Sequence, residues 1–506
     1  MIPSAHNWFS FALLVVSLAV SQAPVMADEL LAGAAKVDIT NRNGVLHVND
    51  PLYVKVLVVK SAETTVVLIT VDAVAIAEIG TIPNDYLSKV RAELKTKFRI
   101  QPEHVMINAS HCHGVVCADV GKRTVAAVKQ AVGKLVPVKI GVGVGHEDRI
   151  MENRRLKLKN GKTVDVRHAY SLPPSEEIAD VGPVDPKIGI LRLDRVSDGT
   201  TLAVVYNFAC HPIQGVPNGG NTADITGFAS RVIEENLDKD TIALFVQGCG
   251  GDINPVRYKD VNQPRDAEPL GNMLGLSTLK TVRKIQTKTD ARLKIINESL
   301  ELPRANTERR IALLEAEQQR LLKSLTGTSL DLETFVPLYV KYKVSGEYPS
   351  YYSHRYMHEK KLGRNDLARM DAVNMKNMKQ YLKNIHTMEK LTRINTNLRL
   401  LRKHQLRNQA AKKRTLTVEL VAMRIGDFVL TTFPGELTVE YGLHIKKKSP
   451  HKHTFVAGYT NGYIFYAPTA EQLRNVGGAQ EDSDCLLAPE WEALYKTSVL
   501  QLLNKL

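Results

Sequence analysis

The chain has 506 residues, of which 44% are hydrophobic and 24% are charged, and this composition excludes a disordered protein. Its length suits two or three domains, or one large domain with an insertion. The net charge of +14 could suit nucleic acid or an anionic membrane. However, no zinc-finger spacing, RNP-like motif or basic region followed by heptads accompanies that charge. We therefore expect no nucleic-acid partner.

The N-terminus has the pattern of a cleaved export signal. Phe9–Val20 is an apolar stretch that is too short to span a bilayer comfortably. The small residues of Val25-Met26-Ala27 suit a signal peptidase, and acidic Asp28 follows them. We predict a signal peptide at 1–27 and export, to the periplasm or out of the cell, after cleavage near Ala27.

From about residue 30 to 300 the pattern alternates between strands and helices. Tyr53–Val59 and Thr65–Val71 are β-branched apolar runs that suit a hairpin or adjacent buried strands, and 85–98 has helical spacing. Further buried strands are predicted at Val105–Asn108, Thr201–Phe208 and Ile242–Gln247. This alternation is typical of an α/β or α+β fold with a mixed sheet. We take 28–300 as the first part of a catalytic core.

The composition changes near Pro303. The stretches 306–325 and 367–413 are helical in propensity, poor in glycine and rich in basic residues. We predict a helical insertion at 301–415, as a long antiparallel hairpin, and a second part of the core at 416–506, where strand patterning resumes. Two interpretations of the insertion stay open. In the first, the insertion is a lid or a docking surface, and peripheral contact with a membrane is one form of docking. In the second, it is a solvated addition to the surface with no such role.

The five cysteines form neither a Cys-x-x-Cys pattern nor an even set. One disulfide in an oxidising compartment stays open as an alternative. Buried free thiols are the plainer interpretation.

The densest chemical signal is Asn108-Ala-Ser-His-Cys-His-Gly114, which follows a predicted strand. Because a strand has a period of two, His111 and His113 should face one side and Cys112 the other. This spacing suits a metal ligand beside a histidine that faces the substrate or transfers a proton.

Other polar side chains follow other predicted strands. His211 ends one buried strand, and Asp224 lies downstream of it. The glycines of 246–255 let the backbone approach a ligand closely, and its amides could stabilise an oxyanion. Phe433-Pro-Gly-Glu436 and the turn 459–466 have a similar form, and we expect all these segments to meet in one crevice beyond the strand ends. Two choices stay open from the residues alone: Tyr463 against Tyr466 in the turn, and loop caps against carboxylates that orient the histidines for Asp224 and Asp252.

Taken together, these segments resemble the catalytic domain of the neutral/alkaline ceramidase family. The similarity covers roughly 30–300 and 416–506. It rests on five motifs in the same order: His-x-His-Gly, Asn-Phe-x-Cys-His-Pro, Gln-Gly-x-x-Gly-Asp, Pro-Gly-Glu and the tyrosine-rich turn.

This resemblance implies a Zn²⁺ ion held by His111, His211, Glu436 and Tyr466. It also implies that His113 faces the substrate and that Arg154 contacts it. Nitrogen and carboxylate ligands suit zinc, and a position left open to water makes such a site catalytic. The expected reaction is hydrolysis of an amide or ester bond in a small or lipid-like substrate by attack of zinc-bound water.

The chain departs from the family pattern at three places. Asn254 stands where ceramidases carry a serine and Val476 stands where they carry a tyrosine, and we expect no counterpart of the family's C-terminal β-sandwich. Asparagine cannot act as an alkoxide nucleophile, although its amide can donate to an oxyanion, so we expect a catalytic role of that kind for Asn254. The alternative is a non-catalytic, zinc-containing protein that binds an acyl or glycan ligand. His113 and Arg154, which a structural zinc site would not need, favour an enzyme.

Overall fold

The structure is a computed structural model of the chain. It describes residues 1, 29–43, 46–62, 64–166, 172–256, 258, 260, 262–350, 352–475 and 478–506. Residues 2–27 of the predicted signal peptide and Val476 lie outside the described residues.

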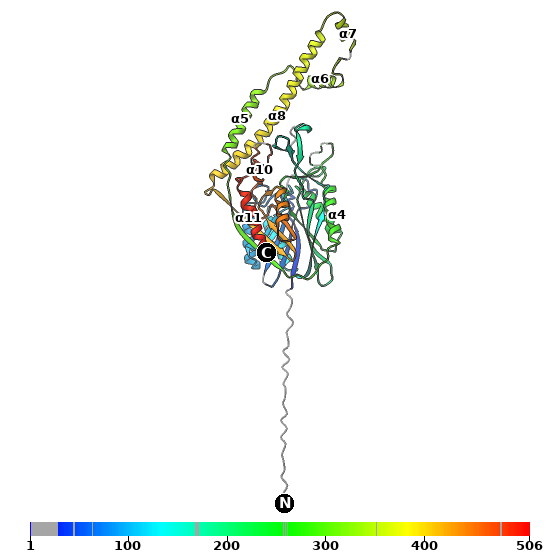
Figure 1. The fold of residues 1–506 in the computed structure, drawn as a ribbon. Coiled ribbons are helices and arrows are strands. Elements are labelled where there is room, and N and C mark those ends of the chain that lie inside the picture. The colour runs from blue at the N-terminus through cyan, green and yellow to red at the C-terminus, as the bar shows by residue number, and fades with distance from the viewer. Residues whose placement is uncertain are drawn as a thin grey trace.

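A large mixed sheet forms the centre of the body (Figure 1). Neighbouring strands are antiparallel except for the parallel pairs β11–β12 and β3–β4. The predicted runs at 53–59 and 65–71 form a hairpin, and the predicted α/β fold is confirmed. In spatial order the eight strands are β12 (Ile242–Gln247), β11 (Thr201–Phe208), β10 (Lys187–Arg195), β5 (Val136–His146), β1 (Leu31–Asp38), β2 (Tyr53–Lys60), β3 (Thr65–Val71) and β4 (Val105–Ala109).

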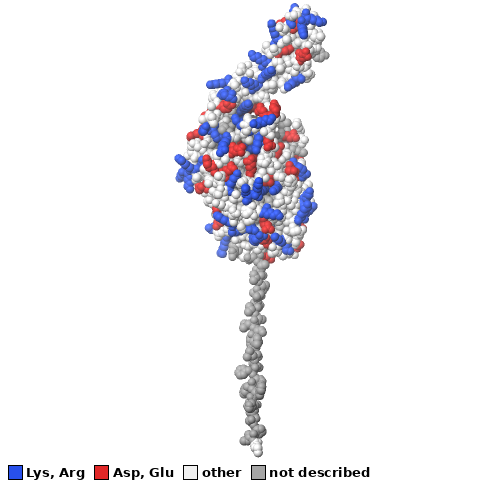
Figure 2. All heavy atoms as spheres, viewed as in Figure 1, with Lys and Arg blue, Asp and Glu red and all other residues white. Residues whose placement is uncertain are grey.

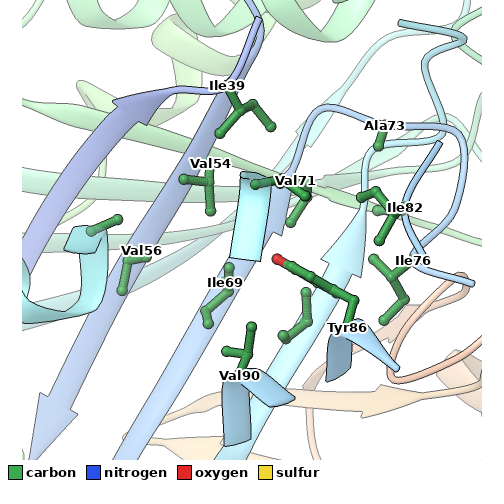
Figure 3. Packing of buried hydrophobic residues seen from close by; sticks show 14 of the residues in the cluster. Ile39, Val54, Val56, Ile69, Val71, Ala73, Ile76, Ile82, Tyr86 and Val90 are labelled. Atoms are coloured by element: carbon green, nitrogen blue, oxygen red, sulfur yellow. The ribbon is translucent and has the colours of Figure 1, made fainter. Parts of the chain in front are cut away.

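Both faces of this sheet are buried, which explains the continuous apolar runs in the sequence. In β2, Val54 and Val56 face helices α1 (Tyr86–Phe98) and α2 (Val120–Val132), as Figure 3 shows for part of that cluster. Leu57 faces the opposite side of the sheet, in a second apolar cluster. The period of two in a strand therefore places alternate valines and leucines in different cores.

A second, four-stranded sheet packs against that opposite face. It consists of β14 (Leu293–Pro303), β15 (Thr415–Ile425), β16 (Phe428–Thr432) and β18 (His453–Ala457), and its side chains share the second cluster with those of the large sheet. Helices α3 (Asp224–Glu235) and α4 (Glu268–Val282) cover the rest of the outer face of the large sheet. Helices α9 (Val439–Lys448) and α11 (Trp491–Asn504) cover the small one. The body is thus a helix–sheet–sheet–helix sandwich.

A helical arm projects from this body (Figure 1). It comprises α5 (Glu308–Ser324), α6 (Leu332–Val344), α7 (His354–Lys361) and α8 (Asp366–Ala410). Helices α5 and α8 run antiparallel, since Thr307 bonds to Gln405 at the base and Thr326 to Asn384 further out. The strands that flank the arm, β14 and β15, pair along their whole length. The chain therefore leaves the small sheet and re-enters it at neighbouring strands.

The base of the arm is packed into the body. Asn397 of α8 accepts a hydrogen bond of 2.5 Å from Ser483. Arg393 lies 3.3 Å from the carboxylate of Asp165. Our division into domains stays a prediction, but these contacts make the inner half of α8 part of one wall of the body.

The arm carries almost all of the net charge. Residues 301–415 contain 24 basic and 11 acidic residues, which is +13 of the total of +14. Figure 2 shows Lys and Arg side chains spread along the arm in this view. The rest of the chain is therefore nearly neutral. No described helix is both long and apolar enough to cross a membrane.

Candidate metal centre

Strand ends bring the candidate residues together. His111 follows β4, His211 follows β11 and Glu436 begins the short strand β17 (Glu436–Leu437). Because β3–β4, β11–β12 and β16–β18 are parallel pairs, their carboxyl ends meet at shared edges, where ligand sites of α/β sheets form.

The three predicted donors form one compact group. The side-chain donor atoms of His111, His211 and Glu436 all lie within 4.8 Å of one another, and all three residues are buried. Nε2 of His211 is 3.0 Å from one carboxylate oxygen of Glu436, and Nε2 of His111 is 3.7 Å from the other. This convergence of two imidazoles and a carboxylate fits a zinc ion.

Backbone carbonyls fix the orientation of both imidazoles. Nδ1 of His111 lies 2.6 Å from the carbonyl oxygen of Val74, and Nδ1 of His211 lies 3.0 Å from that of Ile253. With each Nδ1 directed at a carbonyl oxygen, each Nε2 is the ring nitrogen that faces Glu436 and would bind a metal ion there. Such an arrangement around metal-binding histidines selects the tautomer and holds the ring.

The carboxylate of Glu436 stays charged despite its burial. Burial raises the pKa of Glu436, but His111 and His211 lower it, and the result lies well below the usual range. Tyr459 and Tyr463 each donate a hydrogen bond to this carboxylate. Burial, reinforced by Glu436, holds the pKa of both phenols well above its ordinary value, so they remain donors. A buried, ionised and anchored carboxylate is suited to a divalent cation.

The fourth predicted ligand, Tyr466, reaches the same place through strand pairing. The short strand β19 (Tyr466–Ala467) pairs in parallel with β17, and Tyr466 is the register partner of Glu436. Register partners in a sheet project to the same face. Tyr463 and Tyr466, the two candidates for the fourth ligand, both line the cleft beside the three donors. Tyr463 donates a hydrogen bond to Glu436, whereas the hydroxyl of Tyr466 lies 3.2 Å from Arg154. Tyr466 as a metal ligand stays a prediction.

Arg154 lies wholly buried beneath the centre. Its Nε is 2.7 Å from Glu481, and its other nitrogens donate to Gly251, Tyr466 and Asn254. Burial lowers the pKa of this guanidinium, but the carboxylate of Glu481 raises it above its usual value. Arg154 lines the cleft, and its predicted contact with substrate stays a prediction.

Asn254 lies behind Arg154. It belongs to β13 (Ile253–Pro255), which pairs with β6 (Met151–Asn153), and it is buried. Its side-chain oxygen accepts a hydrogen bond of 3.0 Å from Arg154. Among the described residues its amide nitrogen has no hydrogen-bond partner, so both of its N–H donors remain for another group.

His113 lies in the cleft for a different reason than expected. Strand β4 ends at Ala109 and His111 has a positive φ of 69°, so the segment is a turn and the strand argument is wrong. The turn nevertheless buries Cys112 in the core and leaves His113 exposed at the cleft, with its ring centroid 5.6 Å from that of His111.

Other strained positions surround the centre. Asp224, Tyr459 and Phe465 also have positive φ values, of 55°, 52° and 64°. Few residues other than glycine adopt this conformation, and such strain often gathers at functional sites. The loops around the centre are therefore held in shapes that their own sequences do not favour.

The two aspartates of the open choice both act as loop caps. Asp224 accepts hydrogen bonds from the backbone of Gln214, Gly215 and Ile225, and burial raises its pKa to about 6. Asp252 accepts one from the backbone of Val439, at the start of α9. The five cysteines are unpaired in the structure, and all of them except Cys117 are buried.

These residues surround a cleft of about 340 Å³. Sequence reasoning missed one wall of it, because that wall comes from α8 and from 484. Lys403 of α8 lines the cleft, and the neighbouring His404 bonds to Asp484 at 2.6 Å. No motif marks these positions, since a basic residue in a basic helix carries no signal of its own.

No protein-family model matches the chain, and no curated protein matches it in sequence. Solved structures do match. Neutral ceramidase from Pseudomonas aeruginosa aligns with a TM-score of 0.59 and 16% identity, over 95% of this chain and 75% of that one. A ceramidase complexed with C2 aligns with a TM-score of 0.58 and 16% identity, over 94% of this chain and 75% of that one. The likeness to neutral ceramidase inferred from the motifs is confirmed, and the fold of this chain is the fold of those enzymes.

Proposed function

We propose that this chain is a zinc-dependent hydrolase of an amide or ester bond, related to the ceramidases. The observation that carries the proposal is the buried group of His111, His211 and Glu436 at the end of a cleft. Tyr466 would complete the ligand set. Bound there, zinc would polarise a carbonyl group and lower the pKa of a water molecule to about 7.

The chain's own residues would position the reactants and move the proton. His113 is the exposed imidazole in the cleft and would take a proton from water and return it to the leaving group. Asn254 lies behind Arg154 and does not line the cleft, so its proposed part is to hold Arg154 toward a carbonyl oxygen on which negative charge develops. Because asparagine forms no acyl-enzyme, water would be the nucleophile.

Metal analysis tests this proposal directly. We expect the purified protein to carry about one zinc per chain, and His111→Ala/His211→Ala to carry almost none, because one carboxylate and one phenol are too few ligands. Hydrolysis of a panel of N-acyl amines, acylated amino sugars and esters should stop with a chelator and return with zinc. Full zinc occupancy in the double variant would sink the ligand assignment.

The alternative is a non-catalytic zinc protein that binds an acyl or glycan ligand. The exposed imidazole of His113 beside the centre favours the enzyme, since a structural metal site has no use for it. A zinc-loaded protein that binds members of the panel but hydrolyses none of them would support the alternative.

Export with cleavage near Ala27 is also proposed, on the sequence alone. The intact mass of the native protein tests it, and a soluble protein that still begins at Met1 would contradict it.

Contact of the arm with an anionic lipid surface is a further part of this proposal. It is supported by the apolar side chains that the outer arm exposes next to its basic ones. Ten large ones lie between 332 and 373: Leu332, Val336, Val340, Val344, Tyr348, Tyr352, Met357, Leu362, Met370 and Val373. Exposed apolar side chains that lie next to one another are more typical of a binding surface than of a surface that meets only water.

A further inference from the structure

Two cationic side chains stand at the rim of the cleft. Lys403 comes from α8 and Arg265 from the segment before α4, and both are exposed. Nζ of Lys403 lies 4.5 Å from the ring centroid of Phe465, and the guanidinium carbon of Arg265 lies 5.3 Å from that of Tyr258. Both rings line the cleft. Cation–π contacts of this length hold a cation in place while leaving its other donors available.

Within the part of the chain that the structure describes, neither Lys403 nor Arg265 forms a salt bridge with an acidic side chain. The acidic groups that line the cleft already have partners: Glu436 faces the two histidines, Asp484 faces His404, and Asp224 accepts three backbone hydrogen bonds. None of these carboxylates is therefore paired with Lys403 or Arg265, and both cations remain available to a ligand that enters the cleft.

The neighbouring Arg407 gives a useful contrast. Its guanidinium carbon lies 5.0 Å from the same ring of Phe465, one helical turn beyond Lys403. However, Arg407 pairs with Glu78 at 2.8 Å and does not line the cleft. Lys403 is thus the member of this pair whose charge remains available to a ligand.

Resting on the hydrolase proposed above, we propose that the cleft selects an amide or ester that carries an anionic group. Lys403 and Arg265 are the residues that determine this specificity. A carboxylate, phosphate or sulfonate shares the required chemistry, since guanidinium and ammonium groups donate charge-assisted hydrogen bonds to each of them. A neutral lipid amide would leave both cations unused.

Three matched probes test this substrate class on the zinc-loaded protein. Hexanoyl-taurine carries a sulfonate, hexanoyl-ethanolamine is neutral, and the hexanoyl amide of (2-aminoethyl)trimethylammonium is cationic. We expect kcat/KM to fall in that order, by about fivefold or more at each step at low salt. The differences in kcat/KM among the three probes should become smaller as salt is added.

Charge reversal at the rim assigns the effect to its residues. Lys403→Glu/Arg265→Glu should invert the order of the anionic and cationic probes while zinc content stays unchanged. Arg407→Gln, the matched control, should keep the wild-type order. An order that survives the double reversal would overturn the assignment of the two residues.

The failure of this inference can be told from the failure of the hydrolase. Equal kcat/KM for the three probes would overturn the anionic class and leave the hydrolase intact. If none of the three probes is hydrolysed, the wider panel of amides and esters decides the hydrolase proposal, and calorimetric binding of hexanoyl-taurine against hexanoyl-ethanolamine decides the selectivity. Tighter binding of the sulfonate that Lys403→Glu/Arg265→Glu abolishes would support it, and equal or undetectable binding of both would overturn it.

Discussion

Exposure separates His113 from the two histidines beside it. His111 and His211 are buried and anchored through Nδ1, whereas His113 reaches solvent. If it carries the proton, His113→Ala should lower kcat by about 10²–10⁴ and change the pH–rate profile, with zinc content unchanged. His146→Ala removes a surface histidine and serves as the control. An unchanged profile in His113→Ala would assign the proton transfer to another group.

Asp72 should make folding stability depend on pH. Burial raises its pKa to about 6, although nearby Lys55 lowers it in part, so the folded state holds a proton that the unfolded state has lost between roughly pH 4 and 6. The associated stability, up to about 3 kcal/mol, is present below pH 4 and lost as the pH rises through about 6. Asp72→Asn should remove this component. Denaturant unfolding at several pH values measures this component. If the free energy of unfolding depends on pH equally in the wild-type protein and in Asp72→Asn, the raised pKa of Asp72 is refuted.

At this scale the sequence identifies the candidate metal-binding residues better than the residues that hold them in place. His111, His211 and Glu436 could be predicted because each follows an apolar strand and the family motifs name it. Tyr459 and Glu481 could not be assigned roles, since nothing in the sequence around either residue identifies its partner, Glu436 or Arg154. The residues next to a glutamate in the sequence do not show whether it is buried and paired with an arginine or exposed on the surface.

Elements with one strong period are the ones that the sequence predicts well. The apolar strands β2, β3, β11 and β12 and the helices α5 and α8 match their predicted ranges closely. Helices α6 and α7 were not predicted, because Pro337 lies inside α6 and the tyrosine-rich stretch that includes α7 has no clear helical face. Their stability depends on contacts such as the stacking of Phe335 on Tyr381 of α8, which only the fold supplies.

The outer arm should be removable, whereas its base should not. Thr326 and Asn384 are joined by a hydrogen bond of 2.7 Å, so a short Gly-Ser linker can replace 327–383 without disturbing the contacts below. We expect this protein to fold and to bind zinc as the full chain does. Elemental analysis and thermal unfolding measure both properties.

A deeper cut gives the matched comparison. Removing 303–414 also removes Arg393, Asn397 and His404, which bind the wall next to the centre. We expect this protein to lose stability or zinc. If the two truncated proteins have the same thermal stability and zinc content, whether both remain folded and bind zinc or both lose it, the boundary between arm and base lies elsewhere.

The positive charge of the arm and its exposed apolar side chains predict that the whole molecule binds to anionic membranes. We expect the full chain to float with vesicles that contain phosphatidylglycerol, to bind less as salt rises, and to bind weakly to pure phosphatidylcholine. Val340→Asp/Val344→Asp should reduce binding, whereas Leu494→Asp, an exposed position on the body, should not. If vesicle binding persists when 327–383 is replaced, the outer arm is not the part of the molecule that binds the vesicles.

Helix α8 also sets a distance. It is 45 residues long, about 68 Å at the usual rise, and it runs from the outer arm to the wall of the cleft. Asp366 and Lys403 are 37 residues apart on it, or about 55 Å, which exceeds the roughly 30 Å hydrocarbon thickness of a bilayer. If the arm meets lipid end-on, as proposed, helix α8 would hold the cleft up to about 55 Å above the surface. In that position the substrate would arrive through water, as a dissolved compound or a monomeric amphiphile, and not from the bilayer on which the arm rests.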